Sequence, residues 1–148
     1  MSEVFINLTP HPVTVLEESC ARYDERIRGY ISDGDPVVKM IIPESSKEAI
    51  PRCREVTSPW REICGVATQV KSYGDVDPLP EMRPGTWFIV SSQAAQAGWK
   101  IGRYDLIIPD RLVRSADPAS KSIVGCLGFS VAPELLGRAS PWDGSAVE

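Results

Sequence analysis

The sequence contains very little of what metal sites and imidazole chemistry require. Its 148 residues include a single histidine, His11, and four cysteines, none of which forms a C-x-x-C pair. A structural zinc site usually combines four Cys and His ligands, mostly in closely spaced pairs. We therefore expect no metal and no cofactor. The cysteines are expected to be free thiols, as in a reducing cytosol.

Long hydrophobic runs and an excess of positive charge are also missing. No apolar run approaches the roughly 20 residues of a membrane-spanning helix, and the N-terminus lacks the basic-then-apolar layout of a signal peptide. A net charge of −4 argues against a broad nucleic-acid-binding surface, which needs a basic face. We expect a cytoplasmic protein without a membrane partner. A local basic pocket remains compatible with this composition.

The composition that is present predicts one globular, strand-rich domain. The chain is 43% hydrophobic and 24% charged, and its 13 prolines and 11 glycines are many for a helical protein. We predict an α+β fold dominated by a mostly antiparallel, curled sheet, barrel-like or sandwich, with seven or eight short strands and one or two short helices. Residues 1–137 would form this domain. Residues 138–148 would be a tail, poorly packed unless Trp142 docks on something.

Residues 104–129 organise this prediction because they contain two β-branched, apolar runs. Residues 104–108 and 123–124 are expected to be core strands, and Pro109-Asp110 to be a turn that ends the first of them. Gly125 and Gly128 predict a bulge or a close backbone approach in the second strand. Residues 37–42 and 86–90 are further predicted strands.

The remaining segments are less regular. Residues 17–35 are polar and fit a short helix from Ser19, an insert or an irregular hairpin. Residues 50–57 and 64–73 form a plausible antiparallel pair around a turn at Trp60. Residues 74–85 contain three prolines and predict a long surface connection.

Ser91 follows the clearest strand and is a good N-cap for a helix over residues 92–97, which Gly98 would end. A strand that leads into a capped helix exposes backbone N–H groups at the helix start, and these suit an anion or a phosphate. The alternative is an ordinary corner without a ligand.

His11 lies between two prolines, which hold it in an extended segment. One interpretation is an imidazole presented to a ligand. The other is a turn residue with local hydrogen bonds.

Several of these segments together resemble a family of short phage and prophage proteins. The resemblance covers most of residues 4–129 and carries no assigned activity. Its matching elements are Asn7-Leu8-Thr9-Pro10-His11, Ile42-Pro43-x-Ser45, Tyr73-Gly74-Asp75 with Leu79-Pro80, Ile89-Val90-Ser91, Asp105-Leu106 through Pro109-Asp110-x-Leu112-Val113-Arg114, and Gly125-Cys126-x-Gly128-Phe129. The resemblance implies a phage setting, with the host cytoplasm as its location. This chain departs from the pattern at residues 17–36 and after Phe129.

The leading functional hypothesis is a small, non-enzymatic binding protein. In a phage setting it would counteract host defence by sequestering a nucleotide-type signal or by blocking a defence protein. A nucleotide needs cations for its phosphates and an aromatic ring for its base. The candidate ligand-binding residues are His11, Arg52, Arg54, Tyr73, Ser91, Arg103 and Arg114, with Trp99 as a further aromatic candidate.

Two alternatives belong to other classes. A small nucleotide hydrolase or lyase would use His11 as general acid or base, with Asp105 or Asp110 orienting it and an arginine stabilising the developing charge. A structural or assembly protein would use exposed strand edges and Trp142 to form a homo-oligomer.

Overall fold

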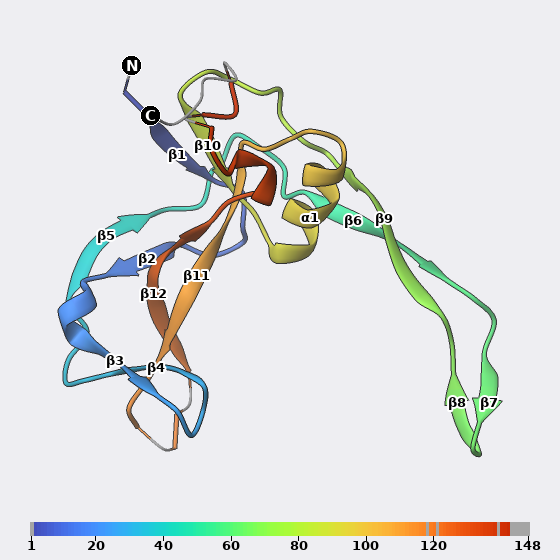
Figure 1. Cartoon of the computed structure of the whole chain (residues 1–148), viewed down its shortest axis with the longest axis horizontal. Coiled ribbons are helices and arrows are strands. Elements are labelled where there is room, and N and C mark those ends of the chain that lie inside the picture. The colour runs from blue at the N-terminus through green and yellow to red at the C-terminus, as the bar shows by residue number, and fades with distance from the viewer. Residues whose placement is uncertain (1, 118, 121, 139, 143–148) are drawn as a thin grey trace.

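The computed structural model describes residues 2–117, 119, 120, 122–138 and 140–142. Its main sheet follows the order β1-β10-β11-β12-β2-β5 (Figure 1). The strands of this path are β1 (Val4–Asn7), β2 (Val13–Leu16), β5 (Val38–Ile42), β10 (Thr86–Ile89), β11 (Leu106–Arg114) and β12 (Ile123–Ser130). A hairpin of β3 (Ala21–Asp24) and β4 (Gly29–Ser32) joins the sheet through β4, which pairs with the C-terminal end of β11.

The main sheet curls but does not close. Its end strands approach each other at one point, where Asn7 of β1 forms an isolated bridge with Glu44 after β5. There the Ser45 N–H donates to the Asn7 carbonyl at 2.8 Å. The prediction of a β-dominated, mostly antiparallel, curled sheet is confirmed. Four of the strand pairs are nevertheless parallel, namely β1·β10, β10·β11, β11·β4 and β12·β2.

The core lies on both faces of the sheet because neighbouring residues of a strand point to opposite sides. Phe88 and Leu106 pack against the helix α1 (Ser92–Lys100), whereas Ile89 and Ile107 pack with Val15 on the other face. All four of these β10 and β11 residues are buried. Strands covered on both faces appear in sequence as continuous apolar runs, and this explains why 86–90 and 104–108 were identifiable.

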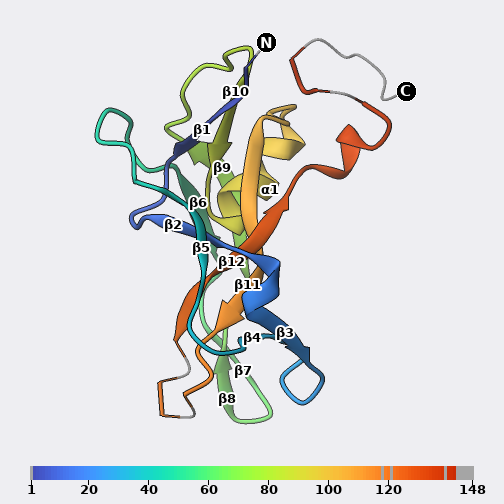
Figure 2. The same ribbon diagram turned by 90° about the vertical axis from the view of Figure 1, so that its left-hand side faces the viewer.

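A long arm extends from this body (Figures 1 and 2). β6 (Arg52–Thr57) and β9 (Lys71–Asp77) form an antiparallel ribbon, and β7 (Arg61–Ile63) and β8 (Val66–Thr68) form a hairpin at its tip. Cys64 and Gly65 join the tip strands with positive φ angles of 51° and 77°, as a tight hairpin turn requires. Figure 2 shows this tip and the β3–β4 hairpin toward one end of the molecule, and β1 and β10 toward the other.

Several predicted element boundaries are wrong. Twelve strands form among the described residues, rather than seven or eight, because residues 17–35 and 61–68 contain hairpins whose strands of three or four residues are too short to show an apolar alternation. Within the first of these, the only helical piece is a 3₁₀ turn at Glu18–Cys20. The second strand of the arm is Lys71–Asp77 instead of 64–73, so the connection predicted at 74–85 begins only after Asp77.

The predicted turn at Pro109-Asp110 is also wrong, because β11 continues through both residues to Arg114. Pro109 lies between the residues that pair with β10 and those that pair with β4, so its missing N–H interrupts neither pairing. The close approach predicted at Gly125 is confirmed. A Cβ there would lie 2.8 Å from the Thr14 carbonyl oxygen of β2, whereas Gly128 has open space around it.

Gly98 does not end α1, which continues to Lys100. A Cβ at Gly98 would lie 2.2 Å from Leu106 Cδ1, so the missing side chain lets the helix approach β11 closely. A second 3₁₀ turn, Pro133–Leu135, follows β12. Within the predicted tail, Trp142 docks edge-on against Trp87, with ring centroids 5.0 Å apart. Residues 139 and 143–148 lie outside the described part of the chain.

Candidate functional site

The start of α1 is built as the sequence predicts. β10 ends in the buried core, and Ser91 follows with the extended backbone of an N-cap residue. Its side-chain oxygen accepts a hydrogen bond from the Ala94 N–H at 3.3 Å. The remaining N–H groups of the first turn have no partner within the helix, which gives this end a partial positive charge.

The base of the arm forms a wall beside this helix start. A cavity of about 340 Å³ opens there, lined by Pro51, Arg52, Cys53, Glu55, Tyr73, Ser91 and Gln93. Two smaller cavities of about 230 and 220 Å³ continue along α1, and their lining adds Gln96, Lys100 and the carboxylate of Asp75. Tyr73 lines all three cavities. We call this continuous feature the α1–arm groove.

Three of the predicted ligand-binding residues thus meet in one place. Arg52 comes from β6, Tyr73 from β9 and Ser91 from the cap of α1. The bulge between Cys53 and Glu55 shifts the register of β6 against β9 at this point. Tyr73 is exposed, so its ring is accessible from solvent.

The electrostatics of the groove favour an anion. Its one carboxylate from β6, Glu55, is bound by Lys71 at 2.7 Å, and this hydrogen bond raises the pKa of Lys71. Arg52 and Lys100 take part in none of the ion pairs formed between described residues. Burial raises the pKa of the Cys53 thiol, so this cysteine adds no negative charge at neutral pH. Asp75 of β9 lines the far cavity together with Lys100, so positive charge predominates only at the Arg52 end of the groove.

The other predicted binding residues lie elsewhere. Arg54 is exposed on β6 and is not among the residues that line the groove. Arg103 donates to both oxygens of Asp105 at 3.0 and 2.9 Å, and the Asp105 carboxylate is fully buried. The Trp99 indole N–H donates to the Leu106 carbonyl at 2.9 Å, so this aromatic braces α1 against β11.

Arg114 lines a separate and larger cavity of about 630 Å³ at the β3–β4 hairpin, together with Arg22, Arg26 and other residues. Asp24 lies between the last two arginines, at 3.9 Å from Arg22 and 3.6 Å from Arg26. The Arg26 backbone N–H lowers the pKa of Asp24, so the carboxylate stays ionised and offsets part of the positive charge. The sequence analysis missed this cavity, because the Arg-x-Asp-x-Arg spacing acts only once the hairpin has formed.

The region around His11 is a structured turn. Asn7 is buried, and its Nδ2 donates to the carbonyls of His11 and Ile42 at 2.8 and 3.0 Å. Its Oδ1 accepts from the N–H and the hydroxyl of Thr9 at 2.9 and 2.6 Å. The His11 side chain is exposed. Sequence reasoning overlooked Asn7, although Asn two residues before Thr-Pro is a recognisable turn signal.

The residues of the enzyme hypothesis lie in different surroundings. His11 is exposed on the loop after β1, Asp105 is enclosed with Arg103, and Asp110 lies within β11. The Ser130 hydroxyl donates to the Asp110 carboxylate, and the Arg111 N–H does so at 2.8 Å. These two hydrogen bonds lower the pKa of Asp110.

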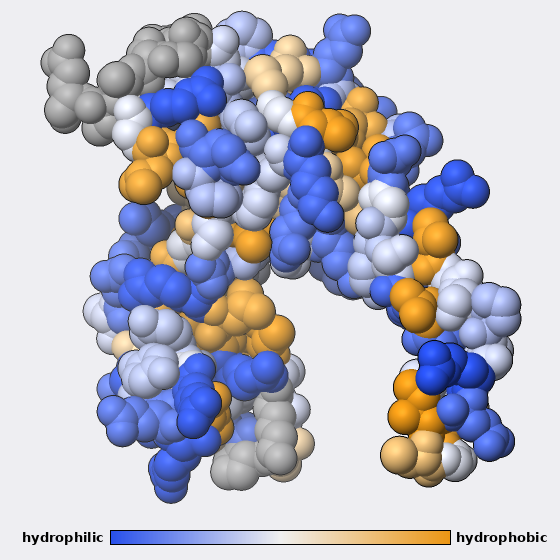
Figure 3. Space-filling view, turned by 45° about the vertical axis from the view of Figure 1, so that its right-hand side comes forward, coloured by the Kyte–Doolittle hydropathy of each residue, from blue (hydrophilic) through white to orange (hydrophobic). Residues whose placement is uncertain are grey.

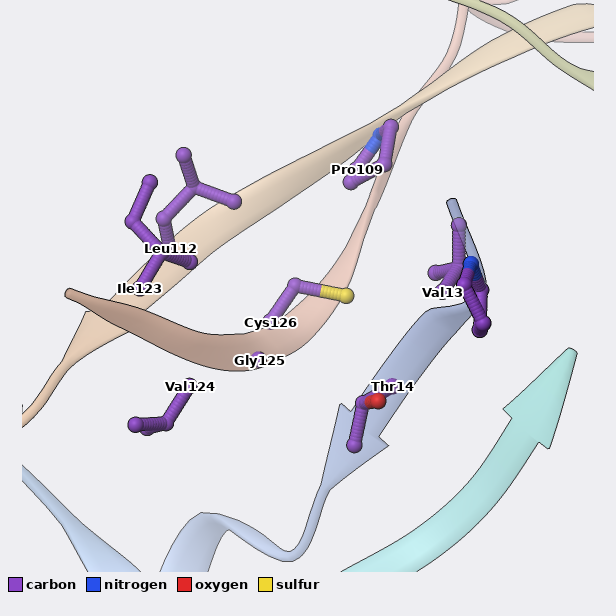
Figure 4. Close-up of a pocket in the computed structure, with 9 residues that line it drawn as sticks. Val13, Thr14, Pro109, Leu112, Ile123, Val124, Gly125 and Cys126 are labelled. Atoms are coloured by element: carbon purple, nitrogen blue, oxygen red, sulfur yellow. The ribbon is translucent and has the colours of Figure 1, made fainter. Parts of the chain in front are cut away.

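A further cavity, of about 180 Å³, lies where β2, β11 and β12 meet (Figure 4). Its lining is largely apolar, and Figure 4 shows the Cys126 sulfur pointing toward the space between Val13 and Pro109. Burial raises the pKa of the Cys126 thiol, so it stays protonated and unreactive at neutral pH. This space is small for a nucleotide-sized ligand.

Comparison of the chain with protein-family models, with curated proteins and with solved structures gives no match. Among the residues that the structure describes, no helix is long and apolar enough to cross a bilayer. In the same part of the chain, no three His, Cys, Asp or Glu side chains lie together as a metal site requires. The functional argument therefore rests on the geometry of the groove.

Proposed function

We propose that this protein is a non-enzymatic binding protein that holds an anionic, nucleotide-type small molecule in the α1–arm groove. The observation that carries the proposal is the convergence of Arg52, Tyr73 and Ser91 on one cavity of about 340 Å³. They were chosen from the sequence for nucleotide chemistry and come from three separate segments. Ligand cavities typically measure about 300–1,000 Å³, so the groove is large enough for part or all of a nucleotide.

Each residue of the groove has a distinct task in this proposal. The guanidinium of Arg52, the Ser91 hydroxyl and the free N–H groups at the start of α1 would bind phosphate oxygens. The exposed Tyr73 ring would stack on the base. Gln93 and Gln96, which line the adjoining cavities, offer amide groups to the edge of the base, and Lys100 adds a cation at the far end.

The biological role is part of the same proposal. The resemblance to phage proteins implies a phage setting in the host cytoplasm, and a counter-defence role is what we propose for a binding protein there. There, binding without turnover would lower the free concentration of a nucleotide-type signal. Direct blocking of a host defence protein is the alternative in the same setting. The experiment below distinguishes it from binding of a small molecule.

The test is native mass spectrometry of the protein purified from cells, followed by denaturation and identification of any released compound. We expect a phosphate-bearing compound on the wild type. Arg52→Ala removes a charge-assisted contact worth about 1.5–3 kcal/mol, which corresponds to a roughly 10- to 100-fold loss of affinity. Tyr73→Ala removes a stacking platform worth about 1–3 kcal/mol.

Arg54→Ala is the matched control, because Arg54 lies two residues along the same strand and does not line the groove. It should retain the compound at the wild-type level. Equal retention by Arg52→Ala, Tyr73→Ala and Arg54→Ala would contradict the groove as the site. A wild-type protein without any compound, but with a bound host protein, would contradict the small-molecule proposal.

A further inference from the structure

The far end of the α1–arm groove carries a carboxylate and an ammonium group side by side. Asp75 of β9 and Lys100 of α1 both line the cavity of about 220 Å³ at this end, together with Tyr73. Neither charge takes part in any ion pair formed between described residues, with the other or with a third group. One acceptor group and one donor group are thus available to a ligand in the same small space.

An irregularity of the arm places Asp75 at this cavity. Between two neighbouring cross-strand pairs, β6 contributes one residue, whereas β9 contributes two, Gly74 and Asp75. Bulges of this kind re-aim a side chain and are frequent beside functional sites. The next residue, Val76, is buried in the core cluster that includes Ala94 and Ala95 of α1, which fixes the backbone at Asp75. Figure 3 shows this base of the arm against the body, with an open hollow between their outer parts.

Lys100 is fixed in a similar way on the opposite wall. It is the last residue of α1, and the preceding Trp99 braces this end of the helix through its hydrogen bond to the Leu106 carbonyl. The nine residues of α1 span about 13 Å at about 1.5 Å per residue. This is of the order of the extended length of one mononucleotide. A nucleotide whose phosphate lies at the Ser91 end therefore brings the edge of its base to the far cavity.

We infer that the far cavity recognises the edge of a guanine base, with Asp75 and Lys100 as the specificity-determining residues; this inference rests on the proposed function. An aspartate carboxylate offers two acceptor oxygens and no donor. Guanine presents two adjacent donors, N1–H and the N2 amino group, beside the acceptor O6. The two donors match the carboxylate of Asp75, and O6 accepts from the ammonium of Lys100.

The other bases match this pair of groups less well. Adenine presents one donor, its N6 amino group, beside the acceptor N1, so one carboxylate oxygen would face a lone pair. Cytosine and uracil each present one donor and two acceptors on this edge. A second phosphate is also a poor fit, because the charges of Asp75 and Lys100 offset each other at this end.

The test uses three probes that share the ribose phosphate and differ in the edge of the base. They are the 5′-monophosphates of guanosine, inosine and adenosine, titrated by calorimetry into the extensively dialysed wild type. Inosine lacks the N2 amino group and therefore one hydrogen bond to the carboxylate, so it should bind roughly 10- to 100-fold more weakly than guanosine. Adenosine also lacks the N1–H donor and should bind more weakly still.

Asp75→Asn tests the residue, because it keeps the shape of the side chain and replaces one acceptor oxygen by a donor. The ratio of guanosine to adenosine affinity should fall by about 10-fold or more. Asp77→Asn is the matched control, since it removes the same charge two residues along β9 and Asp77 does not line the groove. Its ratio should equal that of the wild type. The ratio is the readout because a change of net charge acts equally on the phosphate that both nucleotides carry.

The possible failures of this inference and of the proposed function are distinguishable. Equal affinity of the wild type for the guanosine and adenosine nucleotides would overturn the guanine inference and leave the groove as a binding site. A guanosine preference that survives Asp75→Asn would overturn the role of Asp75. No binding of any of the three nucleotides would overturn both proposals. Arg52→Ala should weaken all three nucleotides to the same extent, because Arg52 acts at the phosphate end.

Discussion

Asn7 provides the sharpest test of how the N-terminal motif works. The structure places residues 7–11 in a turn that the buried Asn7 side chain organises, with His11 contributing its backbone carbonyl. Asn7→Ala deletes four hydrogen bonds and leaves the Ile42 carbonyl without its side-chain donor. It also affects the point where the end of β1 meets Glu44.

The magnitude follows from these contacts. Each hydrogen bond contributes about 1 kcal/mol net, which gives about 4 kcal/mol for the set. The Thr9 and His11 groups are partly exposed and regain water, so we expect a loss of about 3 kcal/mol in the free energy of unfolding. For a domain of this size that corresponds to a fall in Tm of about 6–12 °C.

The assay is urea unfolding followed by tryptophan fluorescence and circular dichroism. Two control variants separate the turn from its imidazole. Thr9→Val removes one hydroxyl and should cost less than about 1 kcal/mol, and His11→Ala should change stability by less than about 0.5 kcal/mol. The reasoning would be refuted by an Asn7→Ala protein within 1 kcal/mol of wild type, or by His11→Ala being equally destabilised.

Three further predictions concern the body of the protein. Gly98→Ala should lower the free energy of unfolding in urea by about 1 kcal/mol. Overpacking against Leu106 costs about 1–3 kcal/mol, and the gain in helix propensity offsets about 1 kcal/mol of this cost. A variant more stable than wild type would contradict the close approach of α1 to β11. Asp105→Ala should cost about 3–5 kcal/mol because it leaves the Arg103 guanidinium, whose side chain is only 17% exposed, without its carboxylate partner. The double variant with Arg103→Ala should cost less than the sum of the two single changes, and strict additivity would argue against the pair. Asp110 has a lowered pKa in the fold, so its stabilising contribution is present above the ordinary pKa of 3.8 and is lost as the pH falls through the lower folded value. The stability difference between wild type and Asp110→Asn should therefore shrink below about pH 4, and a difference independent of pH would contradict this assignment.

The fold was predictable where buried strands appear in the sequence as continuous apolar runs and where a helix has a local capping residue. The runs at 86–90 and 106–108 are covered on both faces, and Ser91 caps its helix through a local hydrogen bond. A hairpin was one of three alternatives for residues 17–35, and the β7–β8 hairpin was not predicted. Strands of three or four residues show no clear alternation, and their pairing depends on tight turns. Pro109 was misleading for a similar reason, since its place between two strand partners is a property of the sheet and not of the dipeptide.

The candidate site was predictable in part. Arg52, Tyr73 and Ser91 were selected by chemistry alone, but their meeting depends on how the arm leaves the body and how α1 packs on β11. Neither the direction of the arm nor the packing of α1 is marked by a local sequence pattern. Arg103 has the same guanidinium group as Arg52 and was selected for the same reason, yet it is bound to the buried carboxylate of Asp105, two residues away. The sequence can therefore propose an arginine as a ligand-binding residue, but only the fold shows whether a carboxylate already binds it.

The most direct test of the central claim is the fate of the compound released from the protein purified from cells. The released compound should be incubated with an excess of fresh wild-type protein and then recovered, and its mass should be measured by mass spectrometry. Binding in the groove without turnover predicts that it returns unchanged, and that Arg52→Ala and Tyr73→Ala no longer retain it. Recovery of a converted product, with conversion abolished by His11→Ala, would contradict the claim and identify the protein as an enzyme.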